Sequence, residues 1–424
     1  MTPLTEHGPA EHGPALRRAR LAVYVMFLIP GVSIGVWTAR IPALKERLEL
    51  GDGQFSLALL AIAAGALAGM QVVGRLVDRY GSARVMVPLA VAQGAVLLLP
   101  AAMPDLITLA ASLALFGAAH GSLDVSMNAG AVEVERAWGR PLMSSFHAVF
   151  SIGGFAGAAL GGVLAHAGVG AWPTLSATGV LLAAVALLTA RWALLIPSER
   201  GTGRSEHGTG QSTPPEKGRR GAPRAKARGV LFLGVLGFCC MVGEGASADW
   251  GSVYLREDLH SSAGFAAAAY AAFSIMMTAG RLVGDRLSAR FGPVALVRCC
   301  GLLAGAGLSA ALLIGHPVAG VIGFGCFGAG LSCIVPQVFS AAGHRDPARA
   351  GQALARVASL GYLGFLTGPV LIGAASEVLD LPRALAIPAL LALFVALAAP
   401  AVRKPAPAPV ATGQAPDHAA GRAG

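Results

Sequence analysis

Residues 74–84 read GRLVDRYGSAR, and the first four letters of this stretch return at residues 280–283. Each copy follows a long apolar run, and each is followed by an Asp-Arg pair, which begins at Asp78 after the first copy and at Asp285 after the second. A motif that recurs in the same setting indicates an internal repeat. The sequence therefore predicts two halves with similar folds.

The sequence around this repeat is strongly apolar. Of the 424 residues, 55% are hydrophobic and 13% are charged, whereas a soluble domain carries about 25% charged residues. A membrane-spanning helix needs about 20 mostly apolar residues. This composition excludes an ordinary water-soluble enzyme and predicts an all-α membrane protein with twelve helices. The apolar runs lie at residues 21–41, 54–73, 85–103, 106–130, 142–165, 172–195, 230–255, 263–281, 294–315, 318–340, 353–375 and 382–402.

A polar segment divides these runs into two sets of six. Residues 197–228 are rich in Gly, Pro, Ser and charge, a composition typical of a flexible linker. We expect an N-terminal bundle at 21–196 and a C-terminal bundle at 229–402, with tails at 1–20 and 403–424. Parallel halves of this kind are typical of one large class of secondary transporters. A repeated glycine spacing supports the duplication, with Gly153, Gly157 and Gly162 in one half and Gly364, Gly368 and Gly373 in the other.

The distribution of positive charge predicts the orientation of the chain. The net charge is +10, but in a membrane protein basic residues set the orientation of loops and contact anionic lipids. The loops on the side of the N-terminus hold most of the 32 Lys and Arg. We therefore expect a multi-pass protein of the cell inner membrane, with both termini in the cytoplasm and no nucleic-acid partner. The opposite loops hold Arg40, Lys45, Arg47, Arg256 and Arg383.

The stretch GRLVDRYGSAR resembles the cytoplasmic loop motif of the major facilitator superfamily, G-x-x-x-[DE]-[RK]-x-G-x-[RK]-[RK], at every fixed position except Ala83. Together with the repeat and the apolar runs, the resemblance covers nearly the whole chain. It implies a twelve-helix fold in two six-helix bundles, transport by alternating access, and a loop that holds one side closed. The gating residues that it implies are Gly74, Asp78, Arg79, Gly81, Arg84, Gly280, Asp285 and Arg286.

A second stretch, HGSLDVSMN at residues 120–128, resembles the fourth span of the fucose:proton symporter branch. The acid of that span takes part in proton coupling, which implies the same role for Asp124. Ala129 stands where that branch has Pro. The stretches 143–147 and 248–257 are similar to uncharacterised bacterial members related to the branch. The resemblance thus implies proton-coupled transport of a sugar-like solute.

Ionisable residues inside the apolar runs are candidate functional groups, because each costs about 2.5–3.5 kcal/mol to insert into a membrane. His120, Asp124 and Asn128 are spaced at i, i+4 and i+8, so they lie on one face of a helix. We expect Asp124 and His120 to couple protons and Asn128 to bind the solute. A structural ladder of interhelical hydrogen bonds is the alternative interpretation.

Further candidates lie in other runs. Glu244 is the second choice for the coupling acid, because an apolar environment favours the protonated form of a carboxyl. His147 forms a polar stripe with Ser144 and Ser151 and either relays protons, binds a hydroxyl of the solute, or packs as a structural histidine. Aromatic and amide side chains suit a sugar-like ligand, although aromatics at the ends of spans also anchor proteins at the membrane interface. The remaining solute-binding candidates are Trp37, Tyr270 and Gln337.

The chain carries no motif for ATP hydrolysis or for a catalytic triad, and its six cysteines lack zinc-ligand spacing. We therefore expect a monomeric transporter rather than an enzyme, without metal or cofactor, whose partners are a small-molecule substrate, protons and the lipid bilayer. One alternative is a drug or metabolite exporter working by proton antiport. Its Gly-Pro motif is missing from the fifth run, although Gly368-Pro369 occurs in the eleventh. The other alternative is a non-transporting membrane sensor.

Overall fold

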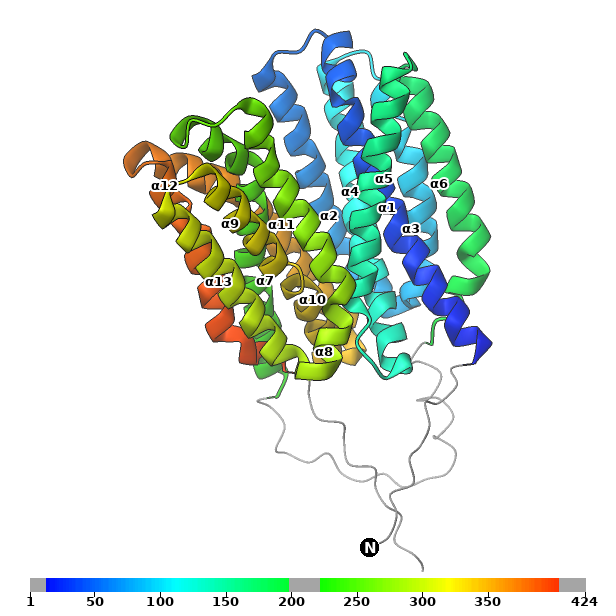
Figure 1. The fold of residues 1–424 in the computed structure, drawn as a ribbon. Coiled ribbons are helices and arrows are strands. Elements are labelled where there is room, and N and C mark those ends of the chain that lie inside the picture. The colour runs from blue at the N-terminus through cyan, green and yellow to red at the C-terminus, as the bar shows by residue number, and fades with distance from the viewer. Residues whose placement is uncertain (1–12, 198–221, 404–424) are drawn as a thin grey trace, which may run out of the picture.

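The computed structural model describes residues 13–197 and 222–403, and within these ranges the chain is helical and contains no strand. Eleven helical stretches in these ranges have the length and apolar composition that a membrane crossing needs. The prediction of an all-α membrane protein is thereby confirmed. The helices are α1 Pro14–Arg47, α2 Asp52–Tyr80, α3 Ser82–Leu97, α4 Leu106–Trp138, α5 Met143–His166, α6 Ala171–Ala193, α7 Ala222–Val253, α8 Ala263–Ile314, α9 Pro317–Leu331, α10 Ile334–Arg345, α11 Ala350–Val378, α12 Leu381–Ala384 and α13 Ala386–Ala398 (Figure 1).

Two helices begin inside segments that were expected to be irregular. Helix α1 begins at Pro14, within the predicted tail, and proline suits a first helical position because it lacks the amide hydrogen that would be unpaired there. Helix α7 begins at Ala222, within the predicted linker. The rest of that linker and most of both tails lie outside the described residues.

Helix α8 contains 52 residues, which at 1.5 Å per residue is more than twice the ~30 Å thickness of a bilayer core. It is interrupted at Gly292, whose φ of 79° is not helical, and Pro293 follows. Other predicted runs are also interrupted. The run at 318–340 is divided into α9 and α10, and the run at 382–402 consists of α12, α13 and a short 3-10 turn.

Helix packing follows the repeated glycines. Helix α1 packs against α5, and α7 packs against α11. A Cβ atom on Gly157 would lie 2.3 Å from the carbonyl oxygen of Val32, and one on Gly368 would lie 2.5 Å from that of Val242. Both crossings therefore bring backbone against backbone, which only glycine permits at this distance. The first two glycines of each predicted set lie at these crossings, whereas the third pair differs, because Gly373 lies against Trp250 and a Cβ atom on Gly162 would have no neighbour within 4 Å.

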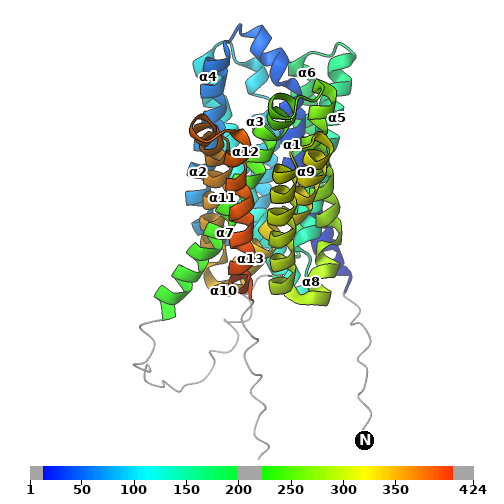
Figure 2. The same cartoon turned by 60° about the vertical axis from the view of Figure 1, so that its left-hand side comes forward.

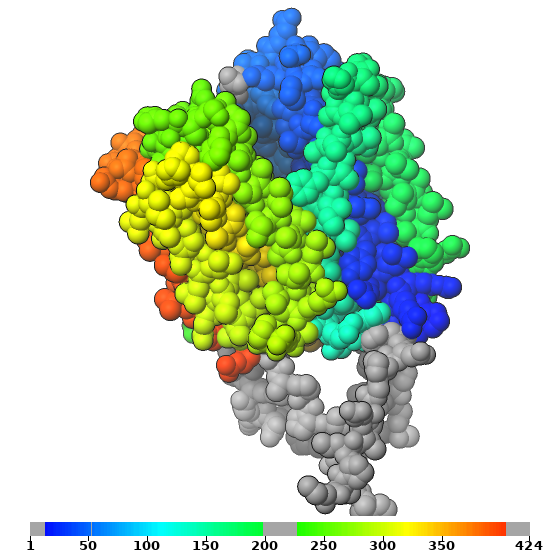
Figure 3. Space-filling view, viewed as in Figure 1, coloured from blue at the N-terminus to red at the C-terminus, as the bar shows by residue number. Residues whose placement is uncertain are grey.

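The helices before and after residue 198 meet along five pairs. Helix α2 packs against α11, α5 packs against α8 and α10, and α4 packs against α10 and α11. We call the end of the molecule at which α1 starts and α13 finishes the lower end, as it stands in Figures 1 and 2. In Figure 3, α5 and α8 diverge toward the upper end and converge toward the lower end. The molecule is thus hollowed from above and closed below.

Candidate functional site

The lower end is closed by carboxylates that bind the N-termini of helices. The first four N–H groups of a helix lack partners within it, and the helix dipole favours negative charge there. At the start of α5, Asp285 of α8 accepts hydrogen bonds from the N–H groups of Ser144 and Ser145 at 2.8 and 3.0 Å. Glu135 of α4 accepts from those of Leu142 and Met143 at 2.9 and 3.1 Å. Two acids from different helices therefore neutralise one helix start.

The start of α11 is held in the same way. Asp78 of α2 accepts a hydrogen bond from the Gly351 N–H at 2.8 Å. It also accepts bonds from the Gln352 N–H at 3.3 Å and from the Gln352 side-chain amide at 2.8 Å. Asp78 and Asp285, the acids that follow the two copies of GRLV, thus make equivalent contacts from opposite halves of the sequence.

Further contacts strengthen this closure. The hydroxyl of Ser340 donates to Glu135, and Arg136 donates to the Gly343 carbonyl, so α4 is bound to α10. Separation of the lower ends of the two sequence halves would therefore break bonds at α2, α4 and α5 together.

The other predicted gating residues fall into two groups. Gly74 lies against α11, where a Cβ atom would come 2.9 Å from the Gly351 carbonyl oxygen, and Gly81 has a φ of 89° in the turn between α2 and α3. Gly280 packs against Ser332 within the second half of the sequence. The charged members Arg79, Arg84 and Arg286 are exposed.

Inside the fold, Asp124, Asn128 and His147 form one polar cluster. The Asn128 amide donates to the main-chain oxygen of Asp124 at 2.8 Å and to its carboxylate at 3.2 Å. Nε2 of His147 lies 3.1 Å from Oδ1 of Asn128, which only accepts, so Nε2 carries the hydrogen. Tyr362 of α11 lies close enough to interact with the charge of Asp124. The hydrogen bonds of the cluster thus connect α4 with α5.

His120 does not join this cluster by a described hydrogen bond. Its ring lies between Phe116 and Phe150, with ring centroids 6.1 and 6.5 Å away, and it is 8% exposed. Its Nδ1 is buried without a hydrogen-bond partner in the structure. His120 therefore packs near two phenylalanine rings, and its role in proton coupling stays a prediction.

Arg281 is a buried cation that the sequence analysis did not single out. It is 8% exposed on α8, and its Nη1 donates to the hydroxyl of Ser151 on α5 at 2.6 Å. Its charge interacts with His147 of α5 and with Glu244 of α7. The available signal was its position in the second GRLV copy, inside an apolar run. Arg281 is therefore near enough to both His147 and Glu244 for its charge to act on them.

Comparisons with known proteins decide the family. The sequence profile of the Major Facilitator Superfamily matches residues 23–350 and 250–423. The chain belongs to the Major Facilitator Superfamily. It is 36% identical to an uncharacterized MFS-type transporter of Yersinia pestis over 91% of this chain and 96% of that protein. It is 31% identical to the membrane protein MosC of Rhizobium meliloti, over 90% and 93% of the two chains.

Solved structures of the superfamily share this fold. The transporter FucP in its outward conformation aligns with a TM-score of 0.75 at 17% identity, over 91% of this chain and 98% of FucP. The human organic anion transporter MFSD10 aligns with a TM-score of 0.69 at 16% identity, over 92% and 100% of the two chains. At these identities the likeness shows the fold alone. A membrane transporter of this superfamily, rather than an enzyme, is what the family and fold indicate.

The remaining predicted solute-binding residues of this superfamily member lie in different places. Tyr270 is 43% exposed and interacts with the charge of Glu244, so α7 and α8 bring these two together. Trp37 is 1% exposed and packs near Phe116. Gln337 is 2% exposed and accepts a hydrogen bond from Ser288. In this conformation Trp37 and Gln337 are buried in helix packing, as is Asn128 of the polar cluster at 0% exposure, so solute contact with any of the three requires the helices to move apart.

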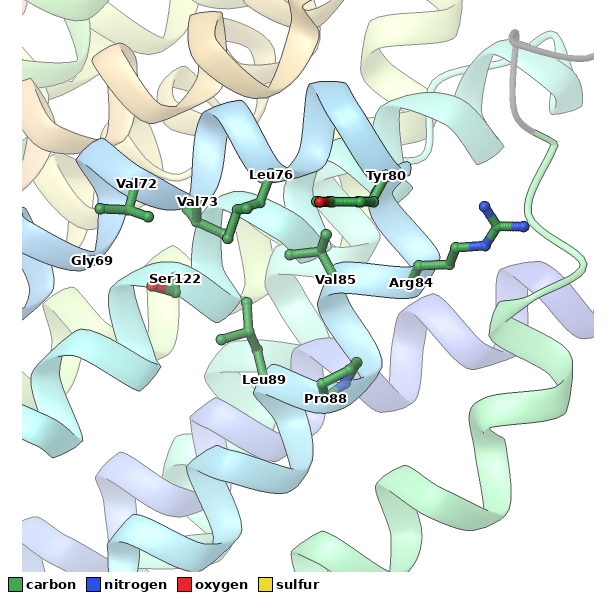
Figure 4. Close-up of a pocket in the computed structure, with 10 residues that line it drawn as sticks. All are labelled: Gly69, Val72, Val73, Leu76, Tyr80, Arg84, Val85, Pro88, Leu89 and Ser122. Carbon is green, nitrogen blue, oxygen red and sulfur yellow. The ribbon is translucent and has the colours of Figure 1, made fainter.

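A separate cavity of about 560 Å³ lies on another part of the transporter (Figure 4). Its lining comes mostly from the lower parts of α2 and α3, and it contains neither Asp124 nor Arg281. Val72 and Leu76 are exposed at its edge. The cavity therefore lies apart from the polar cluster. It is lined by Gly69, Val72, Val73, Leu76, Tyr80, Arg84, Val85, Pro88, Leu89 and Ser122.

Proposed function

We propose that this protein is a proton-coupled secondary transporter that moves a small polar, sugar-like solute across the cell membrane by alternating access. The observation that carries the proposal is the Asp124–Asn128–His147 cluster, which lies within the helices above a closed lower end. An acid at membrane depth is costly unless it serves a function. In this proposal the lower end is the cytoplasmic side, as the distribution of Lys and Arg predicts.

The proposed architecture has twelve membrane crossings in two six-helix bundles, at 21–196 and 229–402. The break at Gly292 supports this count, because it turns the long α8 into two crossings. The glycine crossings of α1 with α5 and of α7 with α11 support the equivalence of the two bundles. Superfamily members with parallel halves bind their solutes at the interface between the halves.

Proton coupling is proposed to work through Asp124. When Asp124 is ionised, its carboxylate accepts from Asn128, and the amide oxygen of Asn128 accepts from His147. Protonation of Asp124 removes one negative charge from the membrane interior and lowers the cost of closing the hollow around a solute. The solute hydroxyls would then bind the amide and imidazole groups of Asn128 and His147. Rocking of the bundles about this site would open the lower end.

Names of two neighbours agree with parts of this proposal. FucP is named a fucose:proton symporter, and MFSD10 is named an organic anion transporter. Because both share only the fold with this chain, the choice of a polar solute depends on its own residues. The polar side chains around Asp124 favour a ligand that carries several hydrogen-bonding groups.

The proposal is tested by transport in proteoliposomes. A panel of sugars, polyols and sugar acids is first screened for thermal stabilisation of the purified protein, since a bound ligand stabilises the state that it binds. Uptake of the best ligand is then driven by an imposed pH gradient. Asp124→Asn should abolish proton-driven accumulation and retain exchange of labelled for unlabelled solute. Glu257→Gln, at an exposed acid on the upper side, is the matched control.

Accumulation by Asp124→Asn at the rate of the wild type would exclude Asp124 as the coupling acid. The same assay separates the alternatives that the sequence leaves open. Proton-driven efflux of the ligand or of a fluorescent drug would support an exporter. Stabilisation by a ligand without any flux would support a membrane sensor.

A further inference from the structure

We propose that the transported solute carries a carboxylate, and that Arg281 binds this carboxylate in competition with Glu244. This inference rests on the proposed transport function and specifies the substrate class of the same site. It starts from the position of Arg281, whose guanidinium lies inside a candidate membrane span and is 8% exposed. A buried cation in a membrane needs a negative partner.

The described contacts of Arg281 leave it without such a partner in direct contact. Nη1 donates to the Ser151 hydroxyl, which is neutral, and Nε is buried with no hydrogen-bond acceptor. Within residues 13–197 and 222–403, the guanidinium forms no ion pair within 4.0 Å of a carboxylate. Glu244 interacts with the same charge from α7 without contacting it directly. A guanidinium can hold a carboxylate with two parallel hydrogen bonds, and most of its donors remain available here.

The position of Arg281 also suits a solute that enters from the upper end. Asp285 lies one helical turn further along α8 and binds the start of α5, so Arg281 lies just above the closure. The hydroxyl of Ser151 and the ring of His147 lie on the facing side of α5. A carboxylate on Arg281 therefore leaves the rest of the solute beside His147 and Asn128. The hydroxyl-binding and acid-binding groups then form one continuous site.

Charge balance explains why the two anions would compete. The titratable groups facing Arg281 are His147 of α5, Glu244 and Cys240 of α7, and Cys333 between α9 and α10. Those facing Glu244 are Arg281 and Tyr270 of α8 and Cys240 on its own helix. Asp285, one turn further along α8, is already bonded to the start of α5, so Arg281, the one cation in this set, balances one other negative charge. Binding of a carboxylate would therefore accompany protonation of Glu244, which leaves the net charge around Arg281 unchanged.

The experiment uses matched pairs of acid and neutral probes with the full-length protein in detergent. The pairs are galacturonate with galactose, gluconate with glucitol, and lactate with 1,2-propanediol. At least one acid should stabilise the wild type, whereas its neutral counterpart should not. Arg281→Gln should weaken binding of that acid by at least tenfold, Arg281→Lys should retain part of it, and Arg191→Gln should not change it. Arg191 is an exposed arginine on α6 and is the matched control.

A second measurement tests the competition. Binding of the acid by the wild type should weaken as pH rises, because Glu244 ionises and returns to Arg281. Residue 244 cannot ionise in Glu244→Gln, so the affinity of this variant for the acid should depend less on pH. Arg281→Lys shows whether a loss in Arg281→Gln reflects misfolding, because it keeps the positive charge.

Two results would overturn the inference. One is that no acid of any pair stabilises the wild type more than its neutral counterpart. The other is that Arg281→Gln, with the thermal stability of the wild type, binds the acid unchanged. Failure of the proposed function looks different, since the acid would bind through Arg281 while proteoliposomes show no flux. Neutral sugars that are bound and accumulated would preserve transport and exclude the carboxylate.

Discussion

Carboxylates hold the start of α5 and the start of α11 in the same way, but α5 has an additional acid. Asp285 and Asp78 each cross from the other half of the sequence to accept N–H groups at a helix start. At α5, however, Glu135 from the same half of the sequence covers two further N–H groups. The comparison teaches that the α5 start can lose the crossing acid and keep a negative partner.

The arginines of the two GRLV copies differ more strongly. Arg75 in the first copy is exposed, whereas Arg281 in the second is buried and bonded to Ser151. The repeated sequence therefore preserves the closure in both halves but places a cation inside the site in only one of them. Identical residues in the two copies of a repeat predict equivalent backbone positions, but they do not predict equivalent side-chain environments.

The largest effect is expected when both acids at the α5 start are neutralised. Glu135→Gln with Asp285→Asn neutralises the acceptors of three bonds that cross between the halves, from the Ser144 and Ser145 N–H groups to Asp285 and from the Ser340 hydroxyl to Glu135, and hydrogen bonds to charged groups contribute about 1.5–3 kcal/mol each. The closed lower end should lose about 2–4 kcal/mol, because the amide oxygens still accept weakly. Spin labels at positions 140 and 290, both exposed, should report a longer distance in most molecules, with Cys299 replaced by Ser before labelling. An unchanged distance distribution would contradict the proposed closure.

A smaller shift is expected for Asp78→Asn alone. It weakens three hydrogen bonds to α11 and should change the ratio of closed to open molecules by about tenfold, or ~1.4 kcal/mol. Asp285→Asn alone should shift it less, because Glu135 still covers the α5 start. The same label pair measures both variants. Equal shifts in Asp78→Asn and Asp285→Asn would show that Glu135 does not compensate for the lost charge of Asp285 at the α5 start.

Alanine at the two GRLV glycines should separate closure from folding. Gly74→Ala places a Cβ 2.9 Å from the Gly351 carbonyl oxygen, so it should push α2 from α11 and populate the open lower end. Gly280→Ala would meet Ser332 of its own half and should lower the melting temperature by a few degrees, as core overpacking of about 1–3 kcal/mol does. Calorimetry and the label pair together distinguish the two results. A change in the label distance in Gly280→Ala would contradict the prediction that this substitution affects folding and not closure.

The smallest effect is expected at a carboxylate that accepts hydrogen bonds only from its own helix. Asp105 at the start of α4 accepts from the Thr108 N–H at 2.9 Å, and this bond lowers the pKa of Asp105 below its usual 3.8. A lowered folded pKa gives stability above the unfolded value that fades as pH falls through the folded value. Asp105→Asn should therefore be slightly less stable at pH 7, and the difference should shrink below about pH 3.8. Melting curves at pH 7 and pH 3 measure it, and the label distance should not change.

Much of the fold was readable from sequence because a bilayer imposes length and polarity on every helix. The apolar runs located the helices, and the glycine spacing located two equivalent crossings. The helix starts at Pro14 and Ala222 were missed, because composition marks where a chain is polar and not where its backbone becomes helical. The interruptions between α9 and α10 and between α12 and α13 each come shortly before a proline, Pro336 and Pro388, and the prediction of continuous helices from the apolar runs did not use this signal.

The site was only partly readable for a related reason. Helical spacing placed Asp124 and Asn128 on one face, and the pair is hydrogen-bonded. The spacing could not show that phenylalanine rings enclose His120, or that Trp37 and Gln337 are buried in packing, because these contacts come from other helices. Arg281 and Glu135 were missed because their roles depend on partners far away in sequence.

Glu135, which binds the α5 start from the same half of the sequence, has a consequence for the rate of transport. When the lower end opens, two N–H groups at that helix start lose Asp285 and must be hydrated, while the other two stay bound to Glu135. The activation barrier for opening at α5 then includes the hydration of half of the helix start. A lower barrier at α5 than at α11 would let α5 and α8 separate first. The turnover rate would then depend on how quickly α2 separates from α11.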